Sequence, residues 1–291
     1  MIGQRSLKEE LELMLNKVKV NKIIHFSNVD GPGNRMAIFF QGCNIGCLYC
    51  HNPETIKLCN NCGVCVEKCP AGALKSIQGK VVYDKNKCID CDNCITVCPN
   101  FSSPKTQEYT VEELYKIVEE YRHFLRGITV SGGEPTLQHA FIAELFKKVK
   151  PLGLTCFVDS NGFFERDEIS ELISETDKFM IDIKAIDNVE KLCGTSMKNN
   201  IDNLKYLLSL DKVHEVRSVI INDFMDAENT VKQVASILKD YPEVTYKLIK
   251  VHANGLKQVQ KDKIKDHVPE QDYMYKLAEL ARGIGVKKIE M

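Results

Sequence analysis

Short apolar runs alternate with amphipathic stretches over the last two thirds of the chain. The apolar runs predict strands at 127–130, 154–158, 179–184, 216–221, 244–249 and 286–289. Between them, apolar residues three and four positions apart predict helices at 111–121, 141–149, 165–176, 199–210, 226–240 and 270–284. Strands and helices in alternation are typical of a parallel sheet, and this many repeats favours a full or partial (β/α) barrel.

The first forty residues have a different pattern. Residues 6–18 predict an amphipathic helix, because Ser6 and Glu9 have capping-box spacing and the apolar side chains form one stripe. We expect this stripe to pack on the body of the protein, with docking of a partner as the alternative. A Gly-Pro-Gly turn at 31–33 precedes an apolar strand at 36–40.

Composition limits the classes of protein to consider. The 291 residues are enough for one large α/β domain, or for one with a small insert. A formal net charge of -1 gives no indication of a nucleic-acid or membrane partner, and no run approaches the length of a membrane span. No apolar leader follows the first methionine. The chain has 13 cysteines, and we expect a reducing, cytoplasmic location in which clustered cysteines bind metal.

Three cysteines follow the 36–40 strand, at Cys43, Cys47 and Cys50. Three thiolates are one short of the four that close an iron–sulfur cube, so one iron would lack a protein ligand. An open metal position is typical of a catalytic site. The three positions also share one face of a helix, which leaves a buried core helix as the alternative. The glycines and the proline around them favour a loop.

A second group of cysteines shows an internal duplication. The spacing Cys-x2-Cys-x2-Cys-x3-Cys-Pro occurs from Cys59 and again from Cys88, with a hairpin predicted between them at 76–83. This is the spacing of two-cluster bacterial ferredoxins, in which the fourth cysteine of each run ligates the other cluster. Structural zinc is the alternative, although zinc does not need the third x2 step. The predicted 4Fe–4S ligand sets are Cys59, Cys62, Cys65 and Cys98, and Cys88, Cys91, Cys94 and Cys69.

Polar residues stand at or just after the predicted strands. The carboxyl ends of parallel strands carry the active sites of barrel enzymes, so we expect these side chains to converge. Taken singly, each has a plain alternative as a helix cap, a surface charge or a rim histidine. The residues are Glu134, Asp159, Asp182, Lys184, Arg217 and His252.

Two of these motifs together resemble the radical S-adenosylmethionine (SAM) superfamily. They are the three-cysteine run with its aromatic Tyr49, and the run Gly132-Gly133-Glu134-Pro135. More narrowly, the chain is similar to the activating enzymes of glycyl radical enzymes over nearly all of residues 20–291. The runs that carry this likeness are 29–33 with Arg35, 39–43, 49–55 and 131–136. The cysteine-rich insert is similar to that of longer family members, and we favour the YjjW-like subgroup.

The resemblance implies a domain organisation and a set of clusters. Residues 21–56 and 105–291 would form a partial (β/α) barrel of the radical SAM type, and 57–104 an inserted two-cluster ferredoxin-like domain. Residues 1–20 would be a helical N-terminal extension. A SAM-cleaving 4Fe–4S cluster on Cys43, Cys47 and Cys50 would bring the number of clusters to three.

The resemblance also implies contacts to SAM. Asp159 and Asp182 would help to hold a monovalent cation near the SAM carboxylate, and His252 would lie near the adenine. Two positions depart from the family: Asn34 stands where an aliphatic residue is usual, and His252 is not in the commoner Leu-Pro-Tyr-His context. The residues implied in SAM binding are Tyr49, Gly132, Gly133, Glu134, Asp159, Ser160, Asp182, Lys184, Arg217 and His252.

The function implied is activation of a glycyl radical enzyme. The chain would cleave SAM reductively to a 5′-deoxyadenosyl radical, which takes a hydrogen atom from a glycine of the partner. A protein such as flavodoxin or ferredoxin would donate the electron, and the insert would relay it or serve only as architecture.

Two other hypotheses remain open. The first is another radical SAM reaction on a peptide or small molecule. The absence of cysteines after Cys193 disfavours peptide maturation. The second is a cluster-bearing electron carrier or redox sensor. We expect Cys156 and Cys193 to be ordinary thiols.

Overall fold

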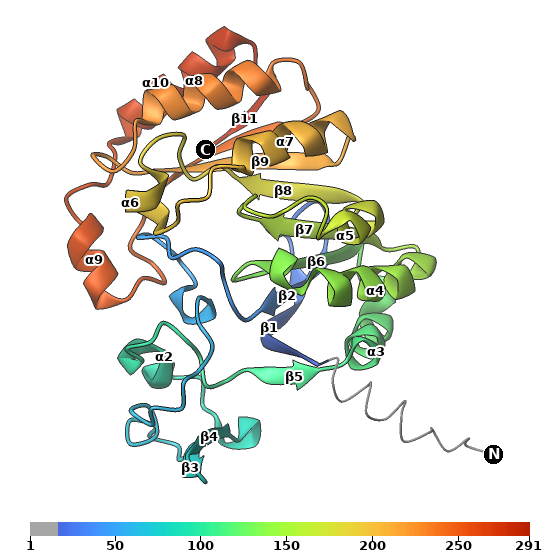
Figure 1. Ribbon diagram of the computed structural model, residues 1–291, viewed down its shortest axis with the longest axis vertical. Coiled ribbons are helices and arrows are strands. Elements are labelled where there is room, and N and C mark those ends of the chain that lie inside the picture. The colour runs from blue at the N-terminus through green and yellow to red at the C-terminus, as the bar shows by residue number, and fades with distance from the viewer. Residues whose placement is uncertain (1–16) are drawn as a thin grey trace.

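The computed structural model describes residues 17–291, which form one large sheet with helices around it (Figure 1). Neighbouring strands are parallel from β2 to β11, whereas β1 is antiparallel to both β2 and β5. The strand order in the sheet is β11 (Lys288–Glu290), β10 (Thr245–Lys250), β9 (Val213–Ile220), β8 (Lys178–Asp182), β7 (Thr155–Ser160), β6 (Gly127–Gly132), β2 (Arg35–Phe40), β1 (Val18–Ser27) and β5 (Gln107–Tyr109). The predicted α/β fold with a large, mainly parallel sheet is confirmed.

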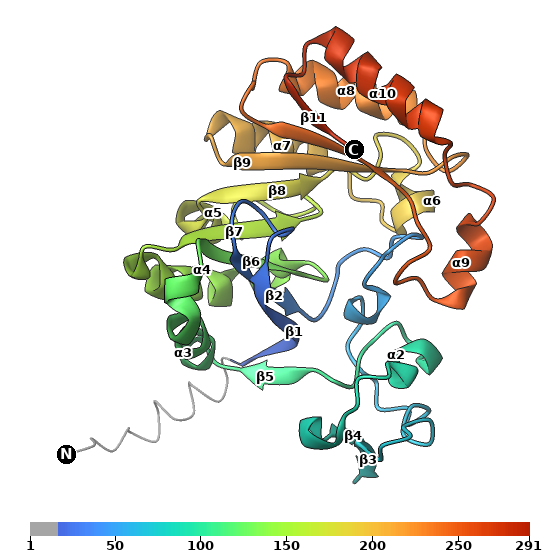
Figure 2. The same cartoon turned by 180° about the vertical axis from the view of Figure 1, so that it is seen from behind.

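Helices connect the parallel strands and cover the outer face of the sheet (Figure 2). The capping box predicted for the first of them is present, because the Thr110 hydroxyl accepts from the Glu113 amide and the Glu113 carboxylate accepts from the Thr110 amide. The long helices are α3 (Val111–Tyr121), α4 (His139–Val149), α7 (Asn200–Ser209), α8 (Ala227–Leu238) and α10 (Gln271–Ile284). Their apolar stripes and the inner strands make one continuous core.

Arg35 joins three strands in the interior of the sheet. Its side chain is fully buried at the start of β2. The guanidinium donates to Thr129 Oγ1 and Thr155 Oγ1, both at 2.8 Å, and to the Ile128 and Thr155 carbonyls at 2.6 and 2.9 Å. It also stacks on Phe157, 4.0 Å from the ring centroid. A buried cation with all of these acceptors is satisfied, so Arg35 has a structural role.

The cysteine-rich region forms a small unit of its own. The predicted hairpin is confirmed: β3 (Leu74–Ile77) pairs with β4 (Lys80–Tyr83), and both residues of the turn have positive φ. The short helix α2 (Asn93–Val97) packs beside the hairpin. Cys65, Leu74 and Cys94 form a small apolar cluster separate from the main core.

Several predictions near the edges of the fold differ from the structure. Most of the helix predicted at 6–18 lies outside the described residues, and Val18 begins β1 instead. The helix predicted at 165–176 is reduced to α5 (Ser170–Glu175), because no side chain caps it and turns precede it. The strands β1 and β5 and the helices α6 (Val189–Cys193) and α9 (Gln258–Ile264) were not predicted. Over residues 17–291, no helix combines the length and the apolarity needed to cross a membrane.

Candidate active site

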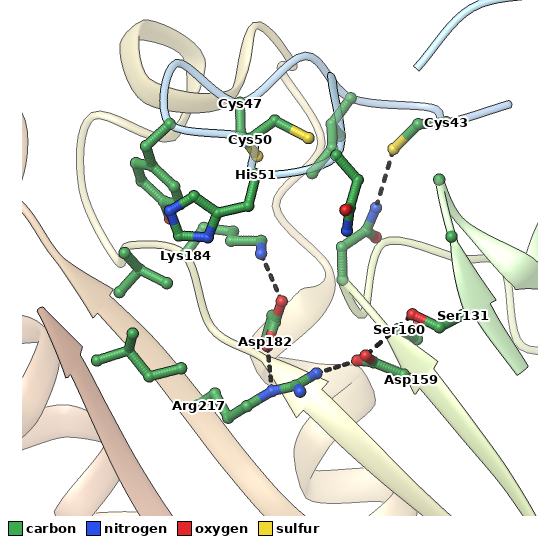
Figure 3. Close-up of a pocket in the computed structure, with 18 residues that line it drawn as sticks. Cys43, Cys47, Cys50, His51, Ser131, Asp159, Ser160, Asp182, Lys184 and Arg217 are labelled. Atoms are coloured by element: carbon green, nitrogen blue, oxygen red, sulfur yellow. Dashed lines mark hydrogen bonds and ion pairs between the residues drawn. The ribbon is translucent and has the colours of Figure 1, made fainter. Parts of the chain in front are cut away.

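A cavity of about 240 Å³ opens at the carboxyl ends of the parallel strands (Figure 3). One wall is the loop that carries the three cysteines, and the other walls are the ends of β6, β7, β8 and β9. Most of the residues expected to bind SAM are therefore brought together. The predicted site residues that line the cavity are Cys43, Cys47, Tyr49, Cys50, Gly132, Gly133, Asp159, Ser160, Asp182, Lys184 and Arg217.

Gln41 closes the base of the cysteine loop. Its side-chain amide donates to the carbonyls of Glu54 and Lys57 at 2.7 and 2.6 Å, although these residues lie on the far side of the loop. The Cys43 amide donates to the Ile56 carbonyl at 2.9 Å, which adds a second closure. No helix occurs between Gln41 and Asn52, so the alternative of a buried core helix is wrong. The side chains of the loop project from a backbone fixed at both ends.

Two glycines, Gly132 at the end of β6 and Gly133 directly after it, allow the chain there to lie close to β2 and to the cysteine loop. A Cβ on Gly133 would lie 2.0 Å from the Gly42 carbonyl oxygen, and one on Gly132 would lie 2.3 Å from the Phe40 nitrogen and oxygen. Gly132 also has a φ of +118°, which L side chains rarely adopt. This close approach permits two backbone hydrogen bonds. The Gly133 amide donates to the Phe40 carbonyl at 3.0 Å, and the Glu134 amide donates to the Gly42 carbonyl at 2.8 Å. The glycines therefore place the cysteine loop.

Glu134 is buried behind the wall of the cavity and does not line it. Its carboxylate accepts from the Thr136 amide and hydroxyl, at 3.1 and 2.7 Å. It also accepts from the Ser160 hydroxyl at 2.9 Å and the Asn161 amide at 2.8 Å. Burial raises the pKa of Glu134 despite these donors. The carboxylate joins the ends of β6 and β7, and the role in SAM binding that the resemblance implies for Glu134 stays a prediction.

Four charged side chains form a continuous array on the floor of the cavity (Figure 3). Arg217 pairs with Asp159, and through Nε with Asp182 at 2.7 Å. Lys184 Nζ lies 2.5 Å from the other oxygen of Asp182. Burial raises the pKa of Asp182, but the two cations outweigh it and lower that pKa to about 2. For Asp159 burial dominates, and its pKa is raised.

This array bears on the predicted cation site. Both carboxylates expected to bind a monovalent cation are paired with the guanidinium of Arg217. Within residues 17–291, no group of three or more His, Cys, Asp and Glu side chains closes around a single metal ion. The monovalent cation at Asp159 and Asp182 stays a prediction.

Cys193, which the sequence assigned no role, lies against the cysteine loop. The Gly46 amide donates to the Cys193 carbonyl at 2.8 Å and the Leu48 amide to the Leu192 carbonyl at 2.9 Å. A hydrogen bond from the Cys193 thiol lowers the pKa of Cys47, whereas burial raises the pKa of Cys43 and of Cys50 to about 12. The carbonyls and the thiol that contact the cysteine loop belong to α6. Neither hydrophobic periodicity nor cysteine spacing in the sequence indicates these contacts.

The cavity wall contains one buried donor without a partner. The Tyr49 hydroxyl has no hydrogen-bond partner among the described residues, although its side chain is only 2% exposed. A buried hydroxyl in this state indicates a site that a bound group completes. Three cysteines on one wall and no fourth among the lining residues fit a 4Fe–4S cluster with one open iron.

His252 lies outside the cavity lining. It is exposed and stacks on His51 with the ring centroids 4.0 Å apart and the planes 5° from parallel. The His51 ring, which does line the cavity, makes a 3.3 Å hydrogen bond with the His252 carbonyl. Its predicted place near the adenine stays a prediction, and the structure gives His252 a contact to the cysteine loop.

The insert cysteines gather in the two predicted sets. Burial raises the pKa of Cys65, and the neighbouring thiols that raise it further are those of Cys59, Cys98 and Cys62. A separate small cavity is lined by Cys69, Cys88, Cys91 and Cys94. The exchange of the fourth cysteine between the two runs is therefore compatible with the folded chain.

Comparison with known proteins gives concordant results. A family model of the radical SAM superfamily matches residues 37–235. A protein of Haemophilus influenzae whose name assigns it glycyl-radical enzyme activation is 35% identical, over 94% of this chain and 95% of its own length. The 4-hydroxyphenylacetate decarboxylase activating enzyme of Clostridioides difficile is 29% identical over 86% of this chain and 85% of its own. The isethionate sulfite-lyase activating enzyme of Desulfovibrio desulfuricans is 29% identical over 81% and 83%.

A solved structure shares the fold. The crystal structure of Streptococcus suis SuiB bound to S-adenosylmethionine superposes with a TM-score of 0.53 at 10% identity. The match covers 83% of this chain and 45% of SuiB. At this identity the likeness concerns the fold alone.

Proposed function

The chain belongs to the radical SAM superfamily, and from this we propose that it activates a glycyl radical enzyme. It cleaves SAM reductively and abstracts a hydrogen atom from a glycine of the partner. The observation that carries the proposal is the cavity in which the three-cysteine loop faces the Asp159, Asp182, Lys184 and Arg217 array. The 35% identity to a relative named for glycyl-radical enzyme activation, over almost the whole of both chains, supports the choice of reaction.

Cys43, Cys47 and Cys50 are the proposed cluster ligands. A 4Fe–4S cluster there would supply one electron to the sulfonium of SAM, which breaks a carbon–sulfur bond to give methionine and a 5′-deoxyadenosyl radical. The chain's part is to bind SAM in one orientation and to exclude water. Gln41 and Gly133 hold the loop that carries the ligands, and these contacts need no metal.

The charged array suits the methionine end of SAM. An α-carboxylate entering the cavity meets Lys184 and Arg217, the two cations of the array. Because Arg217 already pairs with both aspartates, the incoming carboxylate competes with them for its donors. The backbone at Gly132 and Gly133 lines the cavity, and its carbonyl oxygens are the groups that can accept hydrogen bonds from the amino end. A monovalent cation at Asp159 and Asp182 requires Arg217 to release one carboxylate.

The insert, residues 57–104, is proposed to bind two further 4Fe–4S clusters, so that the chain contains three. The two sets of neighbouring cysteines support this assignment, and the spacing disfavours zinc. A low-potential donor such as flavodoxin or ferredoxin would deliver electrons. Assignment to the YjjW-like subgroup and the cytoplasmic location stay predictions from the sequence.

Electron paramagnetic resonance tests the activase function. The reconstituted protein is mixed anaerobically with SAM, reductant and each of several purified glycyl radical enzymes. We expect a glycyl radical signal on at least one partner, with one 5′-deoxyadenosine formed per radical, and none with Cys47→Ala. SAM cleavage without any partner radical, combined with modification of an unrelated peptide or small molecule, would favour another radical SAM reaction instead.

A further inference from the structure

The segment from His252 to α9 contacts both cysteine-bearing parts of the chain. It follows β10 and lies on the same side of the sheet as α2 and the cysteine loop, in both views (Figures 1 and 2). The two residues that make the connection are Lys257, the N-cap of α9, and Gln260 in its first turn. Neither belongs to a family motif identified in the sequence.

Lys257 binds the insert at the end of α2. Its ammonium group donates to the Ile95 carbonyl at 2.8 Å and, through a short hydrogen bond, to the Cys98 carbonyl. It also lies 5.2 Å from the centroid of the Phe101 ring. These carbonyls stand at the carboxyl end of α2, where a positive charge is favourable. Lys257 is therefore a positive charge fixed beside Cys98, a proposed cluster ligand.

Gln260 binds the cysteine loop of the cavity. Its side chain is buried, and its amide donates to the Leu48 carbonyl at 3.0 Å, between Cys47 and Cys50. Its amide oxygen accepts from the Lys257 backbone at 3.1 Å, so both ends of the side chain are bonded. Gly255 packs so closely on the loop that a Cβ would lie 2.3 Å from the His51 carbonyl oxygen. The segment is thus held to the loop by polar and steric contacts.

We propose that Lys257 and Gln260 form a strut that fixes the Cys98 side of the insert to the SAM-cluster loop. We further infer that Lys257 raises the reduction potential of the insert cluster held by Cys59, Cys62, Cys65 and Cys98. A cluster gains negative charge when it takes an electron, and a nearby cation stabilises the reduced form. The electron comes from the low-potential donor protein. This inference rests on the proposed function and assigns positioning residues for its electron supply.

The first test is a potential. Full-length protein with Cys43→Ala and Cys47→Ala is reconstituted, so that only insert clusters give signals, and is titrated under electron paramagnetic resonance. With Lys257→Met, we expect one insert cluster to become about tenfold harder to reduce, which is ~59 mV for one electron. Lys257→Arg keeps the charge and should keep the potential. Lys263→Met, which removes a lysine from the exposed side of α9, should leave both clusters unchanged.

The second test is hydrogen exchange in the cluster-loaded full chain. We expect faster exchange of amides at 95–101 in Lys257→Met, and at 44–50 in Gln260→Leu, with neither change in Lys263→Met. An unchanged reduction potential of both insert clusters in Lys257→Met overturns the proposal. Unchanged amide exchange in Lys257→Met and Gln260→Leu also overturns it. Neither readout requires SAM cleavage or a partner. An insert without iron in a chain that still cleaves SAM would overturn this inference and leave the activase function standing.

Discussion

Replacing Gly133 by alanine should separate the cysteine loop from the sheet. The added Cβ would lie 2.0 Å from the Gly42 carbonyl oxygen and 2.8 Å from the Thr55 carbonyl oxygen, whereas ordinary van der Waals contact begins at 3.4 Å. Both clashing atoms belong to the backbone, so a change of side-chain rotamer cannot relieve the clash. Relief of the clash stretches the Gly133–Phe40 and Glu134–Gly42 hydrogen bonds.

The cost can be estimated from these contacts. Overpacking in a well-packed region costs about 1–3 kcal/mol, and each of the two hydrogen bonds contributes about 0.5–1.5 kcal/mol. Gly133→Ala should therefore lower the free energy of unfolding by about 2–6 kcal/mol, a large part of the ~5–15 kcal/mol of a typical protein. Because Cys43 follows Gly42 directly, the variant should also incorporate less iron at the three-cysteine loop.

Gly46→Ala is the matched control on the same loop. A Cβ at Gly46 meets no atom within 4 Å, and its φ is outside the left-handed region, so we expect a change within about 0.5 kcal/mol. Urea unfolding of the iron-free chains measures the stabilities, and iron analysis with 5′-deoxyadenosine yield measures the site. Equal stability and equal yield for the two variants would refute the view that close approach at Gly133 places the loop.

Three further predictions concern buried charge and thiol chemistry. Arg35→Met removes four hydrogen bonds from the interior of the sheet and should cost about 3–5 kcal/mol in urea unfolding; an unchanged midpoint would contradict its structural role. Arg217→Met leaves two partly buried carboxylates without their shared cation, so SAM affinity measured by calorimetry should fall at least tenfold; unchanged affinity would contradict carboxylate binding by the array. In iron-free protein at pH 8, Cys43 and Cys50 should react with iodoacetamide much more slowly than exposed Cys62, because a pKa of about 12 keeps them protonated. Mass spectrometry of the alkylated peptides measures this, and equal rates at pH 8 would contradict the raised pKa of the two thiols.

The sequence predicted the site best where polar residues stand at the carboxyl ends of parallel strands. Asp159 and Asp182 stand at the carboxyl ends of β7 and β8, and parallel strands bring such ends to one edge. Arg217, also expected at a strand end, lies in the middle of β9 and reaches them because it is paired in register with Asp182. The alternation of strands and helices therefore predicted both the sheet and the cavity. The glycines at 132 and 133 were identified as a motif, but the steric reason for them required the position of Gly42.

Contacts through backbone carbonyls were beyond prediction. Lys257 binds Cys98 across 159 positions of sequence, and Gln260 binds Leu48 across 212, through carbonyls that every residue type carries. Nothing in the periodicity of the chain indicates such partners. The strands β1 and β5 were missed because both lie at one side of the sheet, where exposed polar residues interrupt the apolar pattern.

The central claim is that SAM is cleaved at the three-cysteine loop, and the most direct measurement is the yield of 5′-deoxyadenosine. Anaerobically reconstituted wild type, Cys47→Ala and Cys156→Ala are each incubated with SAM and a strong reductant. Cys156 is a buried thiol of β7 that does not line the cavity, so it controls for the loss of a core cysteine. The account predicts product from wild type and Cys156→Ala and none from Cys47→Ala. Equal product from Cys47→Ala would contradict it.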